Sequence, residues 1–201
     1  MGKIAVVDYG VGNLMSVTNA LSYLGLNNVV TSDRGEIEKA DGIILPGVGA
    51  FGNAARQLVE HGFDSLLKAQ AEVKPMLGVC VGMQLLFESS SEMGQHGGLG
   101  IIPGRVRRIK TGLKLPHMGW NSLEIKKECP IFRGLNGGEY VYFVHSYCAE
   151  VEDPGDVSAT VEYSENFAVS VSRGNVFGLQ FHPEKSGECG LEILKNFGDL
   201  I

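Results

Sequence analysis

Three short apolar strands, each followed at once by a glycine-rich turn and a helical pattern, limit the folds open to this chain. The strand-like runs cover residues 3–8, 40–45 and 75–79, the turns 9–13, 46–49 and 78–82, and the helical patterns 14–24, 52–71 and 81–89. Repeated strand–turn–helix units form a parallel sheet that helices cover on both faces. Because sites in such sheets form outside the carboxyl ends of the strands, the three turns should meet at one edge.

The second half of the chain is dominated by β-type segments, which begin after a polar, glycine-rich loop at 89–98. These segments cover 105–110, 118–125, 140–149, 157–163 and 167–182. Arg173-Gly174-Asn175 is typical of a hairpin turn, and a last helix fits 188–197. We therefore expect a single domain over residues 1–201, in which a sheet that begins parallel acquires antiparallel strands.

Composition excludes several function classes. With 201 residues, 44% of them hydrophobic, the chain can bury one sizeable core. Its net charge is −6 and its densest basic stretch is only Arg105-Val106-Arg107-Arg108, which we interpret as a solvated strand face. Binding of nucleic acid through phosphate neutralisation is therefore not expected. No run approaches the roughly 18 apolar residues of a membrane span, so no membrane association is predicted.

The cysteine and glycine spacings disfavour metal and cofactor sites. The four cysteines stand at positions 80, 129, 148 and 189, and no pair has the Cys-x-x-Cys spacing of a zinc or redox site. Free thiols without a signal peptide fit a reducing cytoplasm. Gly10-Val11-Gly12 opens a helix, but Met15 occupies the third glycine position of the dinucleotide fingerprint. We expect neither a metal ion nor a cofactor.

Gly78-x-Cys80-x-Gly82 has the form of a nucleophile elbow with cysteine in place of serine. A sharp turn from strand to helix forces the nucleophile into strained backbone angles and places it at a helix N-terminus, where the thiolate is favoured. A buried structural cysteine is the commoner role in general, and the other three cysteines, which lack flanking glycines, fit that role.

About a hundred residues further on, His182-Pro183-Glu184 supplies a base and a carboxylate. Proline pushes the preceding residue into an extended conformation, and in an extended chain residues two apart point the same way. Glu184 can therefore orient and balance the charge of a His182 ring that takes the proton of Cys80. The three residues together indicate acyl transfer through a thioester.

Acyl transfer also requires backbone N–H donors directed at the oxyanion. The amide of Val81, directly after the nucleophile, is one natural donor. The turn Pro46-Gly47-Val48-Gly49 ends a neighbouring strand and can present the other, from Gly47 or Val48. A plain tight turn remains the simpler interpretation of this segment.

The motifs at 78–84 (Gly-Val-Cys-Val-Gly-Met-Gln) and 182–186 (His-Pro-Glu-Lys-Ser) resemble those of class I (triad) glutamine amidotransferases. The runs at 8–14 (Asp-Tyr-Gly-Val-Gly-Asn-Leu), 115–121 (Leu-Pro-His-Met-Gly-Trp-Asn) and 142–147 (Tyr-Phe-Val-His-Ser-Tyr) resemble the glutaminase subunits of imidazole glycerol phosphate synthases. The resemblance covers essentially the whole chain. It implies an α/β, flavodoxin-like fold of the class I glutamine amidotransferase type, with a mainly parallel sheet, helices on both faces and added antiparallel strands in the second half.

The resemblance also implies a division of labour within a heterodimer. This chain would hydrolyse glutamine to glutamate and ammonia, and a separate cyclase subunit with a (β/α)8 barrel would receive the ammonia through a tunnel. The cyclase would convert PRFAR into imidazole glycerol phosphate and AICAR, a step of histidine biosynthesis.

Further residues acquire roles only through the resemblance. Gln84 and Glu92 correspond to glutamine-binding positions, where Glu92 would pair with the substrate ammonium. Ser146 and Tyr147 would hold the substrate carboxylate, mostly through backbone groups. The residues expected towards the cyclase are Asn13, Trp120, Asn121 and Lys185.

The family's glutaminase is nearly silent until the cyclase is occupied, and the turn at 46–49 offers a physical reason. If this segment points a carbonyl at the oxyanion site, a peptide flip is needed to present an amide. Gly47 and Gly49 would make that flip cheap. One missing oxyanion donor costs roughly 3–4 kcal/mol, enough for a 100- to 1,000-fold switch.

Three alternatives stay open. Glutaminases of other amidotransferases share the triad but should lack the Pro-His-Met-Gly-Trp-Asn run at 116–121. A stand-alone cysteine γ-glutamyl hydrolase or peptidase would act without a partner. An inactive interaction subunit is disfavoured because Cys80, His182 and Glu184 are all present.

Overall fold

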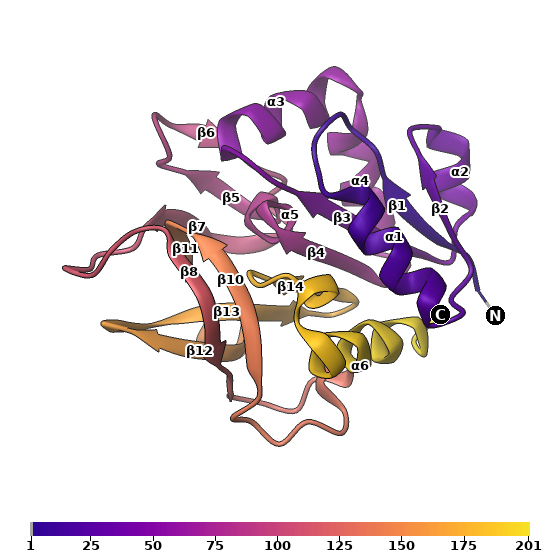
Figure 1. Cartoon of the computed structure of the whole chain (residues 1–201). Coiled ribbons are helices and arrows are strands. Elements are labelled where there is room, and N and C mark those ends of the chain that lie inside the picture. The colour runs from indigo at the N-terminus through magenta and orange to yellow at the C-terminus, as the bar shows by residue number, and fades with distance from the viewer. Residues whose placement is uncertain (1) are drawn as a thin grey trace.

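The computed structural model describes residues 2–201 and is built around a large mixed sheet (Figure 1). Five neighbouring strands run parallel: β2 (Asn28–Thr31), β1 (Ile4–Val7), β3 (Gly42–Gly47), β4 (Met76–Cys80) and β14 (Val176–Leu179). Every residue of β1, β3 and β4 is buried. This uniform burial explains why these strands read as continuous apolar runs, since a central parallel strand is covered on both faces.

Beyond β14 the sheet continues with strands from the second half of the chain. In spatial order these are β13 (Glu165–Arg173), β11 (Tyr147–Val151), β7 (Ile102–Arg108), β5 (Phe87–Ser90) and β6 (His96–Gly97). Strands β12 (Val157–Tyr163) and β9 (Glu124–Ile125) branch from β13. Most of these pairings are antiparallel, although β5 and β7 run parallel. The predicted change from parallel to antiparallel pairing is confirmed.

A separate two-stranded ribbon is formed by β8 (His117–Ser122) and β10 (Tyr140–His145), which run antiparallel. In Figure 1 it crosses in front of the second half of the large sheet. Side chains alternate along each strand. Its inner face carries His117, Phe143 and His145, which are buried, whereas Met118 and Trp120 are exposed on its outer face.

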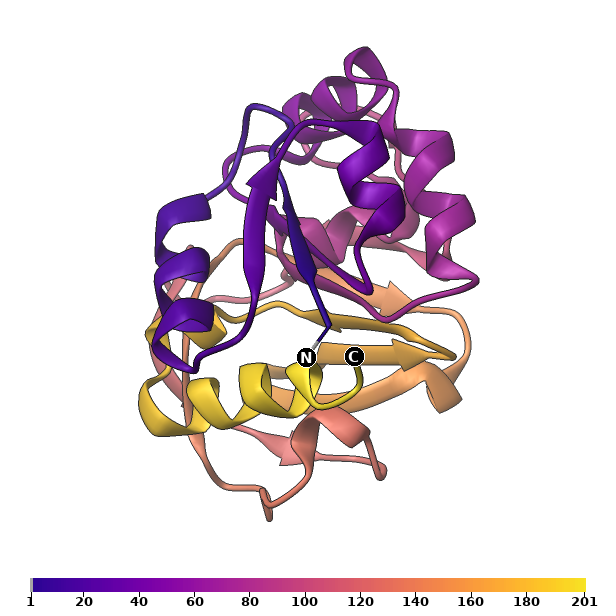
Figure 2. The ribbon, with the colours of Figure 1, turned by 90° about the vertical axis from the view of Figure 1, so that its right-hand side faces the viewer.

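Helices cover both faces of the parallel strands, as predicted. Figure 2 shows α1 (Leu14–Tyr23) and α6 (Gly187–Gly198) together on one face. On the other face lie α2 (Arg34–Lys39), α3 (Phe51–Glu60) and α4 (Phe63–Ala71), with the short α5 (Val81–Leu85) following β4.

Several local predictions were wrong. Strand β2 and helix α2 were not predicted, because β2 is short and partly exposed and therefore lacks an apolar run. The helix expected at 52–71 is two helices, because Gly62 adopts a left-handed conformation with φ 66°. The helix expected at 81–89 ends at Leu85, since the segment 98–102 returns to hydrogen-bond the carbonyls of residues 85–88 and the chain continues as β5.

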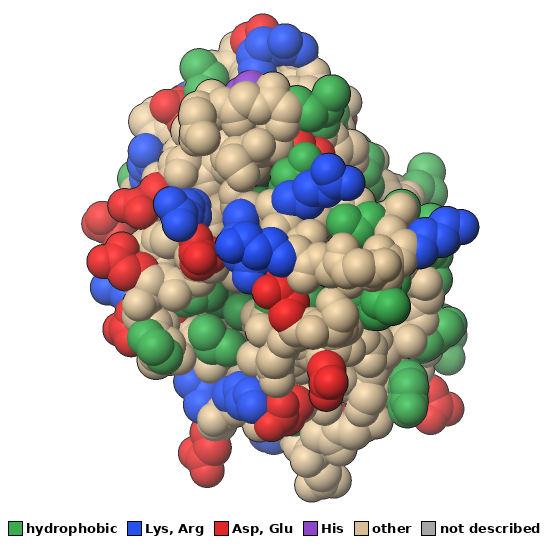
Figure 3. Space-filling model, turned by 90° about the vertical axis from the view of Figure 1, so that its left-hand side faces the viewer, with side chains coloured by type: hydrophobic (Ala, Val, Ile, Leu, Met, Phe, Trp, Pro, Cys, Tyr) green, Lys and Arg blue, Asp and Glu red, His purple; other side chains and the backbone are tan. Residues whose placement is uncertain are grey.

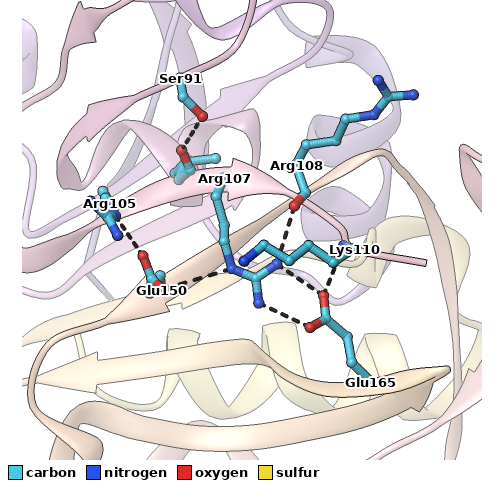
Figure 4. A network of polar contacts seen from close by, with 8 residues as sticks. Ser91, Arg105, Arg107, Arg108, Lys110, Glu150 and Glu165 are labelled. Atoms are coloured by element: carbon cyan, nitrogen blue, oxygen red, sulfur yellow. Dashed lines mark hydrogen bonds and ion pairs between the residues drawn. The ribbon is translucent and has the colours of Figure 1, made fainter.

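The arginine-rich segment of β7 is paired with acidic side chains, and Figure 3 shows basic and acidic side chains intermixed on one face of the molecule. Arg107 makes a bidentate contact with Glu165, at 2.9 and 3.2 Å, and Arg105 pairs with Glu150 (Figure 4). These carboxylates neutralise the positive charge of arginines that could otherwise bind a phosphate group. Arg105 and Arg108 are exposed, as a solvated strand face requires, but the Arg107 side chain is only 22% exposed.

Within residues 2–201, no helix is long and apolar enough to cross a membrane.

Candidate active site

Cys80 is the last residue of β4 and the residue that precedes α5. Its backbone has φ 57° and ψ −114°, a conformation that costs of order 1–3 kcal/mol for a residue with a side chain. This is the strained elbow expected from the glycine pattern. A strained residue of this kind is a candidate for function, because the surrounding structure has to hold it in that conformation. Here the glycines near Cys80 allow the surrounding backbone to do so.

Gly47, Gly78 and Gly82 let three backbone segments touch beneath the elbow. A Cβ atom on Gly82 would overlap the carbonyl oxygen of Leu45, and one on Gly78 would lie 2.7 Å from the carbonyl oxygen of Gly82. A Cβ on Gly47 would lie 2.5 Å from the amide nitrogen of Gly82. Only glycine fits at these positions, so the start of α5 is pressed against the ends of β3 and β4.

His182 follows β14 and has the extended backbone predicted before Pro183, with φ −98° and ψ 98°. Its Nδ1 atom lies 2.9 Å from Oε1 of Glu184. The geometric reason differs from the prediction, because Glu184 lies in a 3-10 turn, Pro183–Lys185, and not in extended chain. Ser186 holds this turn by donating its hydroxyl to the His182 carbonyl at 2.6 Å.

The electrostatics of His182 favour a charged ring. Burial would lower its pKa, but hydrogen bonds and charge interactions with Cys80 and Glu184 outweigh burial and raise the pKa of His182 to about 9. The Glu184 side chain is 1% exposed, so its charge is poorly screened by water. An imidazolium held this way stabilises a neighbouring thiolate and can later donate its proton to a leaving group.

Most of the predicted site residues line one cavity of about 330 Å³. Its walls are formed by Val48, Gly49, Cys80, Val81, Gln84, Glu92, Pro116, Val144, His145, Ser146, Tyr147 and His182. Gly47 is paired with Cys80 in the β3–β4 register and adjoins this cavity through Val48. The volume is at the small end of ligand pockets, about 300–1,000 Å³, which suits a ligand of amino-acid size.

The predicted glutamine-binding residues have defined contacts in this cavity. Glu92 accepts a hydrogen bond from the backbone N–H of Phe51 at 2.7 Å through Oε2, a bond that does not use Oε1. Gln84 lies in α5 and is buried. Its amide donates to Gln180 Oε1 at 2.9 Å and to the Tyr147 carbonyl at 3.4 Å.

Three residues near Cys80 were missed from the sequence. Gln180 is buried, and its Nε2 lies 3.9 Å from the Cys80 sulfur. The Tyr9 hydroxyl donates to the Pro46 carbonyl at 2.7 Å, and burial together with the charge of Cys80 raises the pKa of this phenol. His145 lines the cavity. Gln180 and His145 each interrupt an apolar run, a signal that could have identified them, and Tyr9 begins the turn at 9–13, which was expected at this edge of the sheet.

The residues predicted to face a partner lie outside the cavity. Trp120, 55% exposed, packs edge-on against Tyr142 on the outer face of the β8–β10 ribbon. Lys185 is exposed in the turn after His182, and Asn13 precedes α1. Asn121 differs because its amide donates to the Glu162 carbonyl at 3.0 Å and accepts from the Ser122 N–H at 2.8 Å.

A larger hollow of about 730 Å³ lies along residues 125–135, away from the cavity that Cys80 lines. Its basic side chains are already engaged. Lys127 donates to the Ser172 carbonyl at 3.0 Å, and Arg133 contacts Asn196 at 3.3 Å. Size alone therefore does not make this hollow the active site. Within residues 2–201, no cluster of three or more His, Cys, Asp or Glu side chains is arranged to hold a metal ion.

Comparisons with known proteins agree with this geometry. The family model of glutamine amidotransferase class-I matches residues 5–200. The chain is 51% identical over 202 residues to "imidazole glycerol phosphate synthase subunit HisH" of Moorella thermoacetica, covering 100% of this chain and 96% of that protein. It is 50% identical over 199 residues to the subunit of the same name from Caldanaerobacter subterraneus subsp. tengcongensis, covering 98% of both chains.

Solved structures share the fold at lower identity. A putative GMP synthase component from Thermoplasma acidophilum superposes with a TM-score of 0.76 at 22% identity, covering 100% of this chain and 94% of that one. PurLQS from Thermotoga maritima gives a TM-score of 0.75 at 22% identity, covering 98% of both chains. At this identity the likeness concerns the fold alone.

Proposed function

Because this chain belongs to the class I glutamine amidotransferases and is similar to HisH subunits over its whole length, we infer that it is the glutaminase subunit of an imidazole glycerol phosphate synthase. It releases ammonia from glutamine and acts in histidine biosynthesis together with a cyclase subunit. The conversion of PRFAR into imidazole glycerol phosphate and AICAR, which is a lyase activity, belongs to the complex. The observation that carries the assignment of chemistry is the Cys80–His182–Glu184 arrangement at one wall of the cavity.

The proposed reaction proceeds in two steps. The Cys80 thiolate attacks the side-chain amide carbon of glutamine, and His182 gives a proton to the leaving nitrogen, which departs as ammonia and leaves a thioester. A water molecule then loses a proton to His182 and attacks the thioester carbon, which releases glutamate and restores the thiolate. Glu184 holds the ring through Nδ1, so that Nε2 is the atom that exchanges protons with the reacting groups.

Glutamine would be held at both ends of its backbone. We propose that Glu92 accepts the substrate ammonium through the carboxylate oxygen that Phe51 does not use. The Ser146–Tyr147 backbone would hold the substrate carboxylate, and Gln84 would contact the substrate where it lines the cavity. This arrangement explains why a small cavity would accept an amino acid and exclude a peptide.

The oxyanion would be held by the Val81 amide and by an amide of the Gly47–Val48 segment. A change in which backbone group of this segment points at the oxyanion should occur at the C-terminal end of the turn. Pro46 is held by the Tyr9 hydroxyl and Gly47 is pressed against the start of α5, whereas Gly49, with φ 82°, has open space around its Cα. We therefore propose that a peptide flip involves Val48 and Gly49, and that Gly47 stays fixed.

The cyclase would dock on the outer face of the β8–β10 ribbon and on the turn that follows His182. Trp120 and Lys185 are exposed there, and we propose that they contact a (β/α)8 barrel, with Asn13 at the edge of the contact. Aromatic side chains often carry much of the binding energy of an interface. Because the Asn121 amide is occupied within this chain, we assign Asn121 a smaller share of that contact.

We also propose that residues 1–201 act as one glutaminase domain in the cytoplasm. The match to the family model over residues 5–200 supports the first statement. The four free cysteines support the second, since thiols persist in reducing compartments.

The test combines this chain with a HisH-compatible cyclase and PRFAR, and measures product formation with glutamine or with ammonia as the nitrogen source. Cys80→Ala should abolish the glutamine-dependent reaction and leave the ammonia-dependent one. Cys189→Ala is the matched control and should change neither, because Cys189 does not line the cavity. Glutamine-dependent activity that survives Cys80→Ala would exclude the thioester mechanism.

A further inference from the structure

Two buried histidines, His117 and His145, have no role in the proposed chemistry. They face each other across the β8–β10 ribbon, and Nδ1 of His117 lies 3.0 Å from Nε2 of His145. His117 also stacks on Phe143 and Tyr163, with ring centroids 4.9 and 4.2 Å apart. Burying a polar ring costs free energy unless its nitrogens have hydrogen-bond partners, and each of these four nitrogens has one.

The protons on His145 follow from its neighbours. Its Nδ1 lies 2.8 Å from the Tyr147 carbonyl oxygen, which can only accept, so Nδ1 carries the hydrogen. Burial lowers the pKa of His145 to about 4, so the ring is neutral at pH 7 and Nε2 is an acceptor. The opposing Nδ1 of His117 must therefore donate.

Asn121 supplies the first donor in a series of hydrogen bonds that continues through His117 and His145 to Tyr147. Burial lowers the pKa of His117, which favours the neutral ring with a single N–H group. Since Nδ1 of His117 donates to His145, its Nε2 must be an acceptor. The Asn121 Nδ2 atom lies 3.3 Å from that nitrogen. The amide cannot be reversed, since its oxygen accepts from the Ser122 N–H and its nitrogen donates to the Glu162 carbonyl. Hydrogen bonds thus run one way, from Asn121 through both rings to Tyr147.

The Tyr147 carbonyl joins this hydrogen-bonded series to the nucleophile. It also accepts from Gln84 Nε2 at 3.4 Å, and Gln84 donates to Gln180 Oε1 at 2.9 Å. Gln180 Nε2 in turn lies 3.9 Å from the Cys80 sulfur. A continuous path of polar contacts therefore connects the ribbon that carries Trp120 with the sulfur atom.

We propose that His117 and His145 are positioning residues, which hold the Tyr147 carbonyl for glutamine binding and couple the position of strand β8 to the cavity. This inference rests on the proposed glutaminase function and adds a regulatory connection to it. Asn121 is the neighbour of Trp120 on β8, so a displacement of the outer face by a bound partner moves the first donor of the series. The rings transmit that displacement because each has a single allowed tautomer.

The first experiment compares His117→Phe with Tyr163→Phe in the complex with a cyclase. His117→Phe keeps an aromatic ring against Phe143 and Tyr163 but removes both hydrogen bonds. Tyr163→Phe removes a hydroxyl that lies outside the polar path and bonds the Lys114 carbonyl at 2.7 Å. We expect the KM for glutamine to rise about tenfold in His117→Phe, the effect of one unsatisfied buried group, and to change less than twofold in Tyr163→Phe. Equal KM values in the two variants would overturn the proposal.

A second pair keeps the proposal testable if His117→Phe does not fold. His145→Asn can still donate to the Tyr147 carbonyl from an amide near the position of Nδ1, whereas His145→Leu cannot. We expect the KM of His145→Asn to stay closer to that of the wild type than the KM of His145→Leu does. A purely structural role predicts the reverse order, because leucine suits a buried position better than asparagine.

The third measurement does not depend on catalysis. Nitrogen-15 NMR of the histidine-labelled protein at pH 7 should show both rings neutral and protonated on Nδ1. Protonation on Nε2 in either ring would overturn the proposed path while leaving the glutaminase function intact. A wild-type complex that hydrolyses no glutamine would overturn the glutaminase function, and the positioning role with it, even if the NMR result is as expected.

Discussion

Replacing Glu184 by glutamine removes one charge beside His182 with almost no change in shape. Oε1 of Glu184 accepts from His182 Nδ1 at 2.9 Å, and among residues 2–201 nothing hydrogen-bonds the buried Oε2. A glutamine that keeps the first bond must place its NH2 group where no acceptor lies. A glutamine that turns over presents a donor to Nδ1 and forces the proton to Nε2, where it blocks proton transfer from Cys80.

The magnitude follows from the pKa of His182, which is raised from 6.5 to about 9 by Cys80 and Glu184 against the effect of burial. At about 1.4 kcal/mol per pKa unit, the protein as a whole favours the imidazolium by about 3 kcal/mol, so the two partners together contribute at least that much and also offset burial. Loss of the Glu184 share alone should therefore lower kcat by up to roughly 100-fold, and a reversed tautomer would extend the loss towards about 10,000-fold.

The pH dependence has a defined sign. His182 is protonated below its pKa, so activity that needs the imidazolium declines as pH rises through about 9. Without the carboxylate the pKa falls, and the decline of kcat should begin at a lower pH. The unpaired amide should also reduce the free energy of unfolding by about 1–3 kcal/mol.

The assay measures glutamate release by the complex with a cyclase between pH 6 and 10, with ammonia-dependent product formation as the check that the complex is intact. Glu188→Gln is the matched control, since it removes the same charge from an exposed position in the first turn of α6. If Glu184→Gln retains the kcat and the high-pH limb of the wild type, the assignment of Glu184 to the triad is incorrect.

Three further results are expected. Gly82→Ala should lower the free energy of unfolding by about 1–3 kcal/mol, because the new Cβ overlaps the Leu45 carbonyl. Calorimetry should show the Tm falling by about 2–4 °C per kcal/mol. The control Gly97→Ala, whose Cβ would lie in open space, should change the Tm little. The pKa of His145 is lowered to about 4, so its contribution to stability is complete above about pH 6.5 and lost as pH falls towards 4. Urea unfolding should show that His145→Asn weakens this pH dependence of the free energy of unfolding, and an unchanged pH dependence would contradict the prediction. Trp120→Ala should raise the Kd for the cyclase by about 30-fold or more, measured by calorimetry, whereas Tyr23→Ala, exposed at the far end of α1, should leave the Kd unchanged.

The parallel half of the fold was predictable because its signals are local. Ile4–Val7, Gly42–Gly47 and Met76–Cys80 are buried along their whole length, and each leads into a turn that glycine marks in the sequence. Strand β2 and the break at Gly62 were missed because partial burial and a single left-handed residue leave weak patterns. The end of α5 at Leu85 was missed because residues 98–102, distant in sequence, take over the carbonyls that a longer helix would have used.

The sequence by itself indicated the cysteine elbow, the pairing of His182 with Glu184 and the change in strand direction, because each has a local signal: glycines that flank Cys80, a proline between His182 and Glu184, and strand–turn–helix units that give way to β-type segments. Only the tertiary structure decided what surrounds them. Gln180 and Tyr9 approach Cys80 because strands distant in sequence lie side by side. The path from Asn121 through His117 and His145 exists because an antiparallel register sets two buried rings opposite each other. Register and long-range packing are properties of the whole fold, and no local pattern records them.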